Sequence, residues 1–512
     1  MRTRSWWGWG WTEEALPDDE CVALAALLPG LADRPLPVPV IDLKDPRVRA
    51  PSALRCRVSA EPADRAGHTY GKAYRDVMRA LRGDLAAAPD LVAYPASEDD
   101  VVAVLDWAAS SGVAVVPYGA GSSVVGGVEY RGTDHRGVVS LDMSTMDKVV
   151  EVDRVSRAAL IQAGTLGPAL EDQLRPHGLT LRHFPQSFEF STLGGWLATR
   201  SGGHYATLYT HIDDLVESMR VVTGAGISES WRLPGSGAGP SPDRLFLGSE
   251  GALGIITSAW MRLQDRVVHR ASASFHFGSF AAGLEAVRAI AQSGLNPTNC
   301  RLLDPGEAGL AGLGDRTVLV LGVESAHVPV EGVLASLRTI AGDHGGTPIP
   351  SRDAAADTWR SAFLRMPYVR DAMARMGAIV ETFETACTWD RAESLYHAVR
   401  ADLASTVESV TGSPTIVNCR LTHVYPDGPA PYFTVIAVGR PGSEVAMWDE
   451  IKLAAMETLH RHRATVTHHH AVGRDHRPGY DRQRPEPFAL ALRAAKSVLD
   501  PHGILNPGVL ID

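Results

Sequence analysis

A glycine-rich loop directly after an apolar run is the feature that most restricts how this chain can fold. Residues 113–116 have the apolar character of a short buried strand, and the loop that follows reads PYGAGSSVVGG from Pro117 to Gly127. Glycine lets the backbone come close to a ligand, and successive amides in a tight turn can bind phosphate oxygens. The residues that follow match neither a Walker loop nor a Rossmann fingerprint. A phosphate-binding loop and a plain glycine turn both stay open.

The surroundings of the loop indicate a mixed α and β fold. Ser97 followed by Glu-Asp-Asp is typical of a helix N-terminus, and apolar residues then recur at helical spacing as far as Gly112. Residues 138–141 and 158–161 resemble further strands. Beyond about residue 262, strands alternate with longer helical stretches, which predicts a second α+β domain. A length of 512 residues also favours more than one domain, since single cores rarely grow beyond about 300 residues.

Charge and cysteine content narrow the function. The 49 Lys and Arg against 59 Asp and Glu give a net charge of −10, which argues against non-specific binding to nucleic acid. No apolar run approaches the roughly 18 residues that span a bilayer, and the N-terminus lacks the features of a secretory signal. The five cysteines stand far apart and form no CxxC pair, so neither a disulfide framework nor a zinc site is expected. A cytoplasmic location is the resulting expectation.

Two further segments combine glycines with polar side chains. Between Pro185 and Gly203, small and hydroxyl residues are dense enough to present amides and hydroxyls to a planar polar ligand. Ser191 and Thr192 are equally suited to cap a helix, and both interpretations can hold together. The segment Gly248–Ile256 places glycines and one acid before an apolar strand, which is a weak signal by itself.

Histidine and tryptophan clusters complete the candidate features. His468, His469 and His470 are adjacent, so on a strand they could not all face one metal ion, and we expect no metal site. One or two of them could hold an anion or relay a proton, and a plain surface position is the alternative. Four tryptophans lie within residues 6–11. We expect them to pack against the protein itself, with a foothold on a membrane surface as the alternative.

The order of these segments resembles the vanillyl-alcohol-oxidase, or PCMH-type, family of FAD-binding proteins. The segments are PYGAGSSVVGG, PQSFEFSTLGGWLATRSGG, IDDLVESMRVVTG and GSEGALGIIT, and LDPHGILNPG near the C-terminus is also typical of that family. Within it, the chain is most similar to the alkyldihydroxyacetonephosphate synthase family. That closer resemblance rests on WWGWGW, on CRLLD at 300–304, on ETFETACTWDR at 381–391, on CRLTHVYPDGPAPYF at 419–433 and on THHHAVG at 467–473.

The resemblance implies an α+β fold. It consists of a PCMH-type FAD-binding domain of two subdomains, an α+β cap domain that binds substrate, and a C-terminal helical segment that returns to the flavin. We place an irregular, tryptophan-rich segment at 1–85, the FAD-binding domain at 86–265, the cap at 266–465 and the C-terminal segment with the three histidines at 466–512. The segment after Asp304 is much shorter than the family's insertion over the active site.

The resemblance also implies roles for residues of this sequence. FAD, without a covalent link, would be held by Pro117, Tyr118, Gly119, Ala120, Gly121, Ser122, Ser123, Gln186, Ser187, Glu189, Ser191, Thr192, Ala198, Thr199, Arg200, Ser201, Ser249, Glu250, Gly251, Gly254 and Ile255. The catalytic residues would be Tyr432 as acid/base, Arg301, His468, His469 and His470, and Arg370 would bind substrate. Tyr432 can shuttle a proton if cationic neighbours lower its pKa from about 10.

The implied reaction exchanges the acyl chain of acyl-dihydroxyacetone phosphate for a long-chain alcohol, as in ether-lipid synthesis, with no net oxidation. Flavin N5 would trap the dihydroxyacetone-phosphate carbon while the fatty acid leaves, and the alcohol would then attack the same carbon. Lipid-like substrates, a homodimer and peripheral membrane contact are the implied partners. The alternatives are an FAD-dependent 2-hydroxy-acid or alcohol dehydrogenase on the same fold, and a flavin- or lipid-binding protein that has lost its chemistry.

Overall fold

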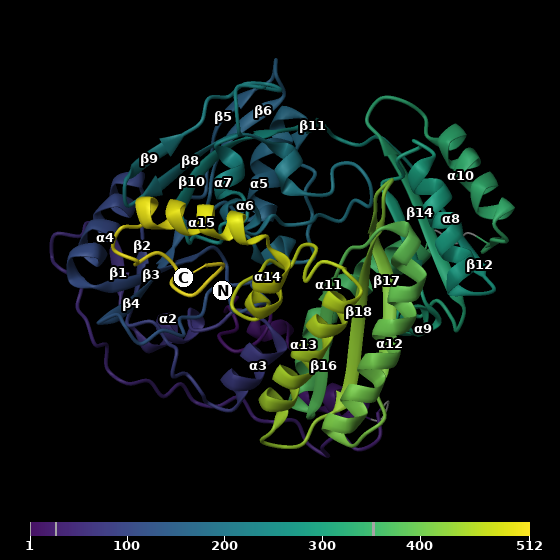
Figure 1. Ribbon diagram of the computed structural model, residues 1–512, viewed down its shortest axis with the longest axis horizontal. Coiled ribbons are helices and arrows are strands. Elements are labelled where there is room, and N and C mark those ends of the chain that lie inside the picture. The colour runs from purple at the N-terminus through teal and green to yellow at the C-terminus, as the bar shows by residue number, and fades with distance from the viewer. Residues whose placement is uncertain (1, 26–27, 351–353, 512) are drawn as a thin grey trace.

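The computed structural model describes residues 2–25, 28–350 and 354–511, which form two regions side by side (Figure 1). The first region holds a four-stranded sheet in the order β1 (Arg57–Ser59), β2 (Leu91–Tyr94), β4 (Gly137–Asp142) and β3 (Val113–Tyr118). Its second sheet has the order β5 (Val149–Asp153), β6 (Ala158–Gln162), β10 (Ile255–Arg262), β8 (Val216–Thr223) and β9 (Gly226–Glu229), with β7 (Leu179–Thr180) and β11 (Gln264–Asp265) as a separate pair.

The second region is built on one seven-stranded sheet. Its order is β15 (Thr347–Pro348), β12 (His269–Phe277), β14 (Thr317–Ser325), β13 (Asn299–Leu303), β17 (Ile416–Val424), β18 (Pro429–Val438) and β16 (Ala378–Glu384). Four helices cover one face of this sheet, namely α8 (Phe280–Gln292), α10 (Glu331–Asp343), α12 (Trp389–Thr411) and α13 (Glu444–Arg461) (Figure 1). Three more helices complete the region, namely the short α9 (Pro305–Leu310), α11 (Ala354–Arg375) and α1 (Asp18–Ala25), which comes from the N-terminal part of the chain.

The remaining helices belong to the first region or return to it. They are α2 (Pro62–Gly67), α3 (Tyr74–Leu81), α4 (Glu98–Ser111), α5 (Gly167–Leu174), α6 (Leu193–Thr199), α7 (Asp243–Phe246), α14 (Arg477–Gln483) and α15 (Glu486–Leu499). After α15 the chain runs beside β3, where the amide of Val115 donates to Ile504 O at 2.8 Å and the amide of Asn506 to Val115 O at 2.8 Å. Within the described part of the chain, no helix is both long enough and apolar enough to cross a membrane.

Local signals explain the elements around the glycine loop. The Ser97 hydroxyl accepts the Asp100 amide at 3.2 Å, and the Asp100 carboxylate accepts the Ser97 amide at 3.2 Å, so α4 begins at a capping box. Gly112 ends that helix with a φ of 65°, which a residue with a Cβ rarely adopts. The strands expected at 113–116, 138–141 and 158–161 are confirmed as parts of β3, β4 and β6.

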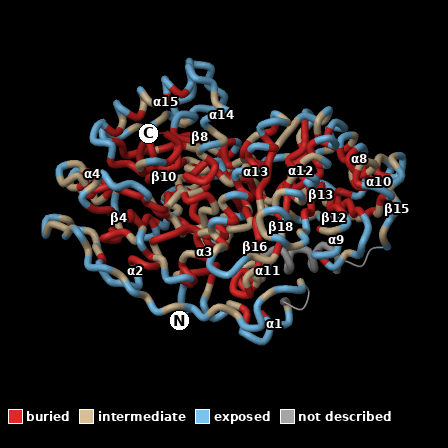
Figure 2. The backbone as a smooth tube through the Cα atoms, turned by 60° about the horizontal axis from the view of Figure 1, so that its bottom comes forward, coloured by how far each residue is buried: buried red, intermediate tan, exposed pale blue. Residues whose placement is uncertain are grey.

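Residues 1–85 contain more regular structure than expected. Besides α1, β1 and α2, they include α3, whose Tyr74, Val77, Met78 and Leu81 follow helical spacing and are buried. These side chains join the core of the second region, so α3 ties the two regions together, and Figure 2 shows its backbone among the buried segments. The prolines of residues 35–51 favour irregular structure, but they do not extend to α3, where the apolar residues follow helical spacing.

A cluster of buried charges lies beneath α3. Asp76 is fully buried beside Glu129 and Asp475, and Arg131 bonds to both of those acids at 2.7 Å. One Asp76 oxygen accepts the Ala73 amide at 3.3 Å, and the other has no hydrogen-bond partner among the described residues. Burial, followed by Asp475 and Glu129, raises the pKa of Asp76 to about 7.

We expect Asp76→Asn to raise the melting temperature more at pH 8 than at pH 5. A carboxyl whose pKa is raised from 3.8 to about 7 on folding costs stability increasingly as pH rises from about 4 through 7. The amide cannot ionise, so the gain in stability should grow between pH 5 and pH 8 by up to about 3 kcal/mol, because the cost rises over the two pH units from 5 to 7 at about 1.4 kcal/mol per unit. Thermal unfolding of the exposed Asp172→Asn variant provides the control. An equal shift for Asp76→Asn at both pH values would contradict the assignment.

Candidate active site

A cavity of about 860 Å³ lies between the glycine loop and the seven-stranded sheet. Most residues predicted to hold FAD line it, namely Pro117, Tyr118, Gly119, Ala120, Gly121, Ser122, Ser123, Gln186, Ser187, Ser191, Thr192, Ala198, Thr199, Ser201, Glu250, Gly251, Gly254 and Ile255. Arg301, Arg370, Tyr432, His469 and His470 line the same cavity. The structure therefore brings the two predicted sets of residues, far apart in the sequence, to one space.

Four predicted residues do not line this cavity. Glu189 is exposed in a short 3₁₀ turn, and Arg200 caps α6 and pairs with Asp213 at 2.8 Å. Ser249 is buried next to Glu250 without reaching the cavity wall. His468 lies behind His469, where its Nε2 is 2.7 Å from the Tyr425 hydroxyl.

The glycine loop has the close approaches that a cofactor cradle needs. A Cβ on Gly119 would lie 2.4 Å from Thr192 Oγ1, and one on Gly121, whose φ is +71°, would lie 2.1 Å from the Tyr118 hydroxyl. A Cβ on Gly251 would lie 2.2 Å from Pro117. Thr192 also accepts the Gly195 amide as the cap of α6, so the capping interpretation of that segment is confirmed, and ligand binding by it stays a prediction. These contacts fit a loop whose backbone faces a phosphate-bearing ligand such as FAD.

Sheet register creates a polar row across three strands. Glu384 of β16 lies directly opposite Tyr432 of β18, which lies opposite Arg420 of β17. Directly paired residues point to the same face of a sheet. The Arg420 guanidinium carbon is 3.9 Å from the centre of the Tyr432 ring, and Arg420 pairs with Glu307 at 2.6 Å. Arg301 enters the same face from β13, where its Nη2 is 2.8 Å from His204 Nδ1.

The pKa of Tyr432 is raised, although a lowered pKa was expected for a phenol that shuttles a proton. Burial raises the pKa of Tyr432, and the nearby Arg420 only partly opposes this effect. A cationic neighbour is present, as that expectation required, yet the desolvation of a fully enclosed phenol outweighs it. Tyr432 is therefore a protonated hydrogen-bond donor at neutral pH.

The arginines keep their charge. Burial, with Arg420 as a like-charged neighbour, lowers the pKa of Arg301 to about 9. For Arg420, burial lowers the pKa, but Glu307 outweighs it and the net shift is upward. Both groups therefore stay cationic at neutral pH, which suits them to an anionic substrate group.

The three histidines occupy an irregular segment between α13 and α14, not a strand. Burial lowers the pKa of His468 and of His469 well below 6.5, and that of His470 less strongly. A neutral imidazole can accept a proton on one ring nitrogen and donate a hydrogen bond from the N–H group of the other. Ring nitrogens of His423, His468 and His469 lie within 4.8 Å of one another, so strand alternation gives no reason against a shared metal here. The absence of a metal site stays a prediction.

The tryptophan segment holds the predicted substrate arginine in place. Arg370, on α11, donates to Asp371 Oδ1 at 2.7 Å and to Lys72 O at 2.7 Å, and the Trp9 amide donates to Asp371 Oδ2 at 2.5 Å. A Cβ on Gly10 would lie 1.9 Å from the Tyr368 hydroxyl, which explains the alternation of tryptophan and glycine against α11. Trp7 and Trp9 are buried, so packing against the protein itself is confirmed.

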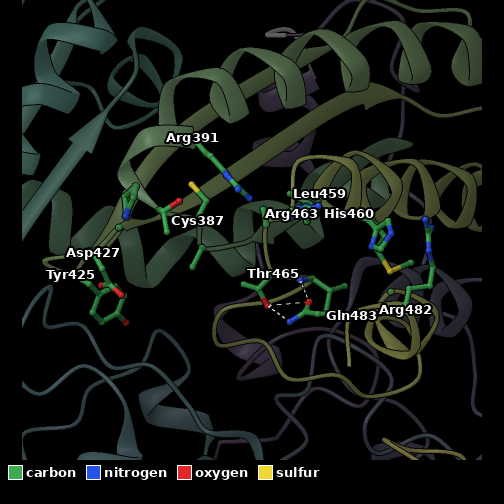
Figure 3. Close-up of a pocket in the computed structure, with 18 residues that line it drawn as sticks. Cys387, Arg391, Tyr425, Asp427, Leu459, His460, Arg463, Thr465, Arg482 and Gln483 are labelled. Atoms are coloured by element: carbon green, nitrogen blue, oxygen red, sulfur yellow. Dashed lines mark hydrogen bonds between the residues drawn. The ribbon is translucent and has the colours of Figure 1, made fainter. Parts of the chain in front are cut away.

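Apolar side chains also line the cavity. They come from α1 and the segment after it, from α9 and α11, and from the strands β17 and β18, and they are Leu24, Leu28, Leu310, Met366, Val369, Met373, Ile416 and Ile436. A second cavity of about 600 Å³ has Tyr425 in its wall and is bounded by residues of α12, α13 and α14 (Figure 3). None of the predicted site residues lines this second cavity.

Sequence reasoning missed several polar groups of the site. Arg420, Glu307, His204 and His423 line the main cavity, and Glu384 lies directly behind it. Arg420 and His423 fall within the quoted segment 419–433, and Glu384 within 381–391, so the motifs pointed to the right regions. The pairing of β16, β18 and β17, which selects these residues, is a long-range property that no local pattern indicates.

Known proteins share this fold. The chain matches the family models described as FAD binding domain over residues 89–229 and as FAD linked oxidases, C-terminal domain, over residues 267–510. It is 30% identical to the alkyldihydroxyacetonephosphate synthase of Trypanosoma brucei brucei, over 87% of this chain and 76% of that protein. It is also 30% identical to the alkyldihydroxyacetonephosphate synthase of Dictyostelium discoideum, over 99% of this chain and 93% of that protein. A solved alkyldihydroxyacetonephosphate synthase structure has a TM-score of 0.83 at 26% identity, over 98% of each chain. These findings confirm the FAD-binding fold and the FAD cofactor.

Proposed function

The chain belongs to the alkyldihydroxyacetonephosphate synthase family, and from this premise we propose that it exchanges the acyl chain of acyl-dihydroxyacetone phosphate for a long-chain alcohol. The observation that carries the proposal is the mixed lining of the cavity. Arginines and histidines line it together with the cofactor loop, and so do hydrocarbon side chains. Along β17 and β18, the apolar pair Ile416 and Ile436 lies four residues from the polar pair Arg420 and Tyr432. A phosphate ester with a long acyl chain likewise combines a charged head with an apolar tail.

Each polar group suits one part of the exchange. FAD, held by the glycine loop and the other residues predicted to bind it, would supply a nucleophilic nitrogen, N5. Arg301 and Arg370 bind the phosphate, because guanidinium groups match phosphate oxygens with paired hydrogen bonds. Tyr432 donates a hydrogen bond to a substrate oxygen. The fatty acid leaves as a carboxylate, and neutral His469 or His470 accepts the proton that the alcohol loses as its oxygen bonds to carbon.

An absorbance spectrum tests the proposal directly. The purified protein should be yellow, and anaerobic palmitoyl-dihydroxyacetone phosphate should bleach the flavin band and release palmitate, with recovery when a fatty alcohol is added. A protein that ignores this substrate but bleaches with a 2-hydroxy acid would be a dehydrogenase instead. A protein that cannot take up FAD would contradict both functions.

A homodimer and peripheral membrane contact belong to the same proposal. A lipid-like substrate supports membrane contact, and the exposed side chains of Val22 and Leu310 lie on α1 and α9, two of the elements that contribute apolar side chains to the cavity lining. Sedimentation equilibrium and co-sedimentation with phospholipid vesicles test the two points separately.

A further inference from the structure

Glu384 is a buried carboxylate that does not line the main cavity. It ends β16, its side chain is fully enclosed, and its position opposite Tyr432 aims it at the face that carries the site. A charge in such a place is costly unless it is fully hydrogen-bonded or paired. The groups around Glu384 therefore indicate which part of the structure its charge stabilises.

Four donors converge on Glu384 from the histidine segment. Oε1 accepts the Thr467 hydroxyl at 2.9 Å and the amides of His469 and His470 at 2.9 and 2.6 Å. Oε2 accepts the amide of His468 at 2.6 Å. Three successive backbone amides and one hydroxyl thus point at a single carboxylate, which fixes the backbone from residue 467 to residue 470.

The carboxylate stays charged in this setting. Burial would raise the pKa of Glu384, but His470, His468 and the backbone donors outweigh burial and hold it at about 2. His470 Nδ1 is 3.4 Å from Oε1. The other charges that act on His470 are Glu381, which favours its protonation, and Lys452 and Arg420, which oppose it.

The rest of the segment is anchored by other groups. Before the histidines, the amide of Val466 donates to Gln483 Oε1 at 2.8 Å, and Figure 3 shows Gln483 bonded to Thr465 as well. After them, Glu250 of the first region accepts the amides of Val472 and Gly473 at 2.9 and 2.8 Å. Glu384 is therefore the anchor that acts on the histidines themselves.

We propose that Glu384 is the positioning residue of the site, which sets the backbone of the three histidines and thereby the direction in which His469 and His470 face the substrate. This inference rests on the proposed function for its catalytic part only. Its structural part concerns the conformation and reactivity of the histidines and holds for any reaction in the cavity.

Glu384→Gln provides the test, because glutamine keeps the shape but presents an NH₂ group to amides that also donate. We expect the FAD-bound variant to show several-fold faster acylation of residues 468–470 by diethyl pyrocarbonate, measured by peptide mass spectrometry. We also expect kcat to fall by roughly 10²-fold with a smaller change in KM, since about 1 Å of misplacement has that effect. A folded, FAD-bound variant with wild-type histidine reactivity would overturn the proposal.

Glu171→Gln is the matched control. Glu171 is also buried and accepts a threonine hydroxyl, from Thr180 at 2.8 Å, and a backbone amide, from Leu181 at 3.0 Å, away from the cavity. The Glu171→Gln variant should have a lower melting temperature than the wild type but the same reactivity of the three histidines. If Glu384→Gln does not fold, Thr467→Val removes one donor and keeps the charge, and faster acylation is again expected, with unchanged acylation counting against the proposal. An inactive wild type would refute the proposed function, whereas histidine reactivity does not depend on it.

Discussion

Tyr432→Phe is expected to lower turnover by about 10²–10⁴-fold while FAD stays bound, the usual range for loss of a positioned proton donor. The hydroxyl is the only group removed. The ring keeps its contact with Arg420, whose guanidinium carbon lies 3.9 Å from the ring centre, so the cavity wall should keep its shape. Because burial raises the pKa of Tyr432, the wild-type phenol is a donor throughout the neutral range.

The measurement is steady-state release of fatty acid together with the flavin spectrum. Tyr396→Phe is the matched control, since Tyr396 is a buried tyrosine on α12, on the other face of the same sheet, bonded to Arg400 at 2.6 Å. It should retain turnover. If Tyr432→Phe matched this control, the phenol would have no part in the chemistry.

Gly121→Val is expected to weaken FAD binding by roughly 10²-fold and to yield a nearly colourless protein. Its φ of +71° costs a residue with a Cβ about 1–2 kcal/mol. The added Cβ would also lie 2.1 Å from the buried Tyr118 hydroxyl, and overpacking of that kind adds about 1–3 kcal/mol.

Equilibrium titration of the apoprotein with FAD measures this effect. Gly83→Val controls for backbone strain alone, because Gly83 has a φ of +75° but nothing within 4 Å of its added Cβ. Gly83→Val should bind FAD like the wild type at some loss of stability. Equal FAD affinity in Gly121→Val and the wild type would show that the glycine loop is not the cofactor cradle.

The sequence was most informative where the determinants are local. The Ser97 cap, the left-handed Gly112 and the glycine loop all depend on neighbouring residues, and the structure has each of them where expected. The row of Glu384, Tyr432 and Arg420 depends on strand pairing between residues far apart in the chain. Such register is set by the packing of a whole sheet, so motifs identified the segments but not which side chains meet.

The direction of the pKa shift of a buried group could not be predicted from the sequence either. A cation beside Tyr432 was a reasonable condition for a lowered pKa, and Arg420 does lie beside it. The degree of burial decides the sign of the shift, and burial follows only from the complete fold. The same holds for Asp76, which the sequence shows only as one acid of a short helix.

The return of the chain to β3 has a consequence for how the enzyme is made. Asn506 Nδ2 donates to Gly127 O at 3.0 Å and to Glu250 O at 2.7 Å, so it links two of the segments that surround the cofactor cavity. During synthesis on the ribosome, β3 and the glycine loop emerge almost 400 residues before this partner. The cofactor site is complete only after residue 506 has been released. Loading of FAD should therefore be a late event, and nascent chains that stop short of residue 504 should expose an incomplete site to cellular quality control.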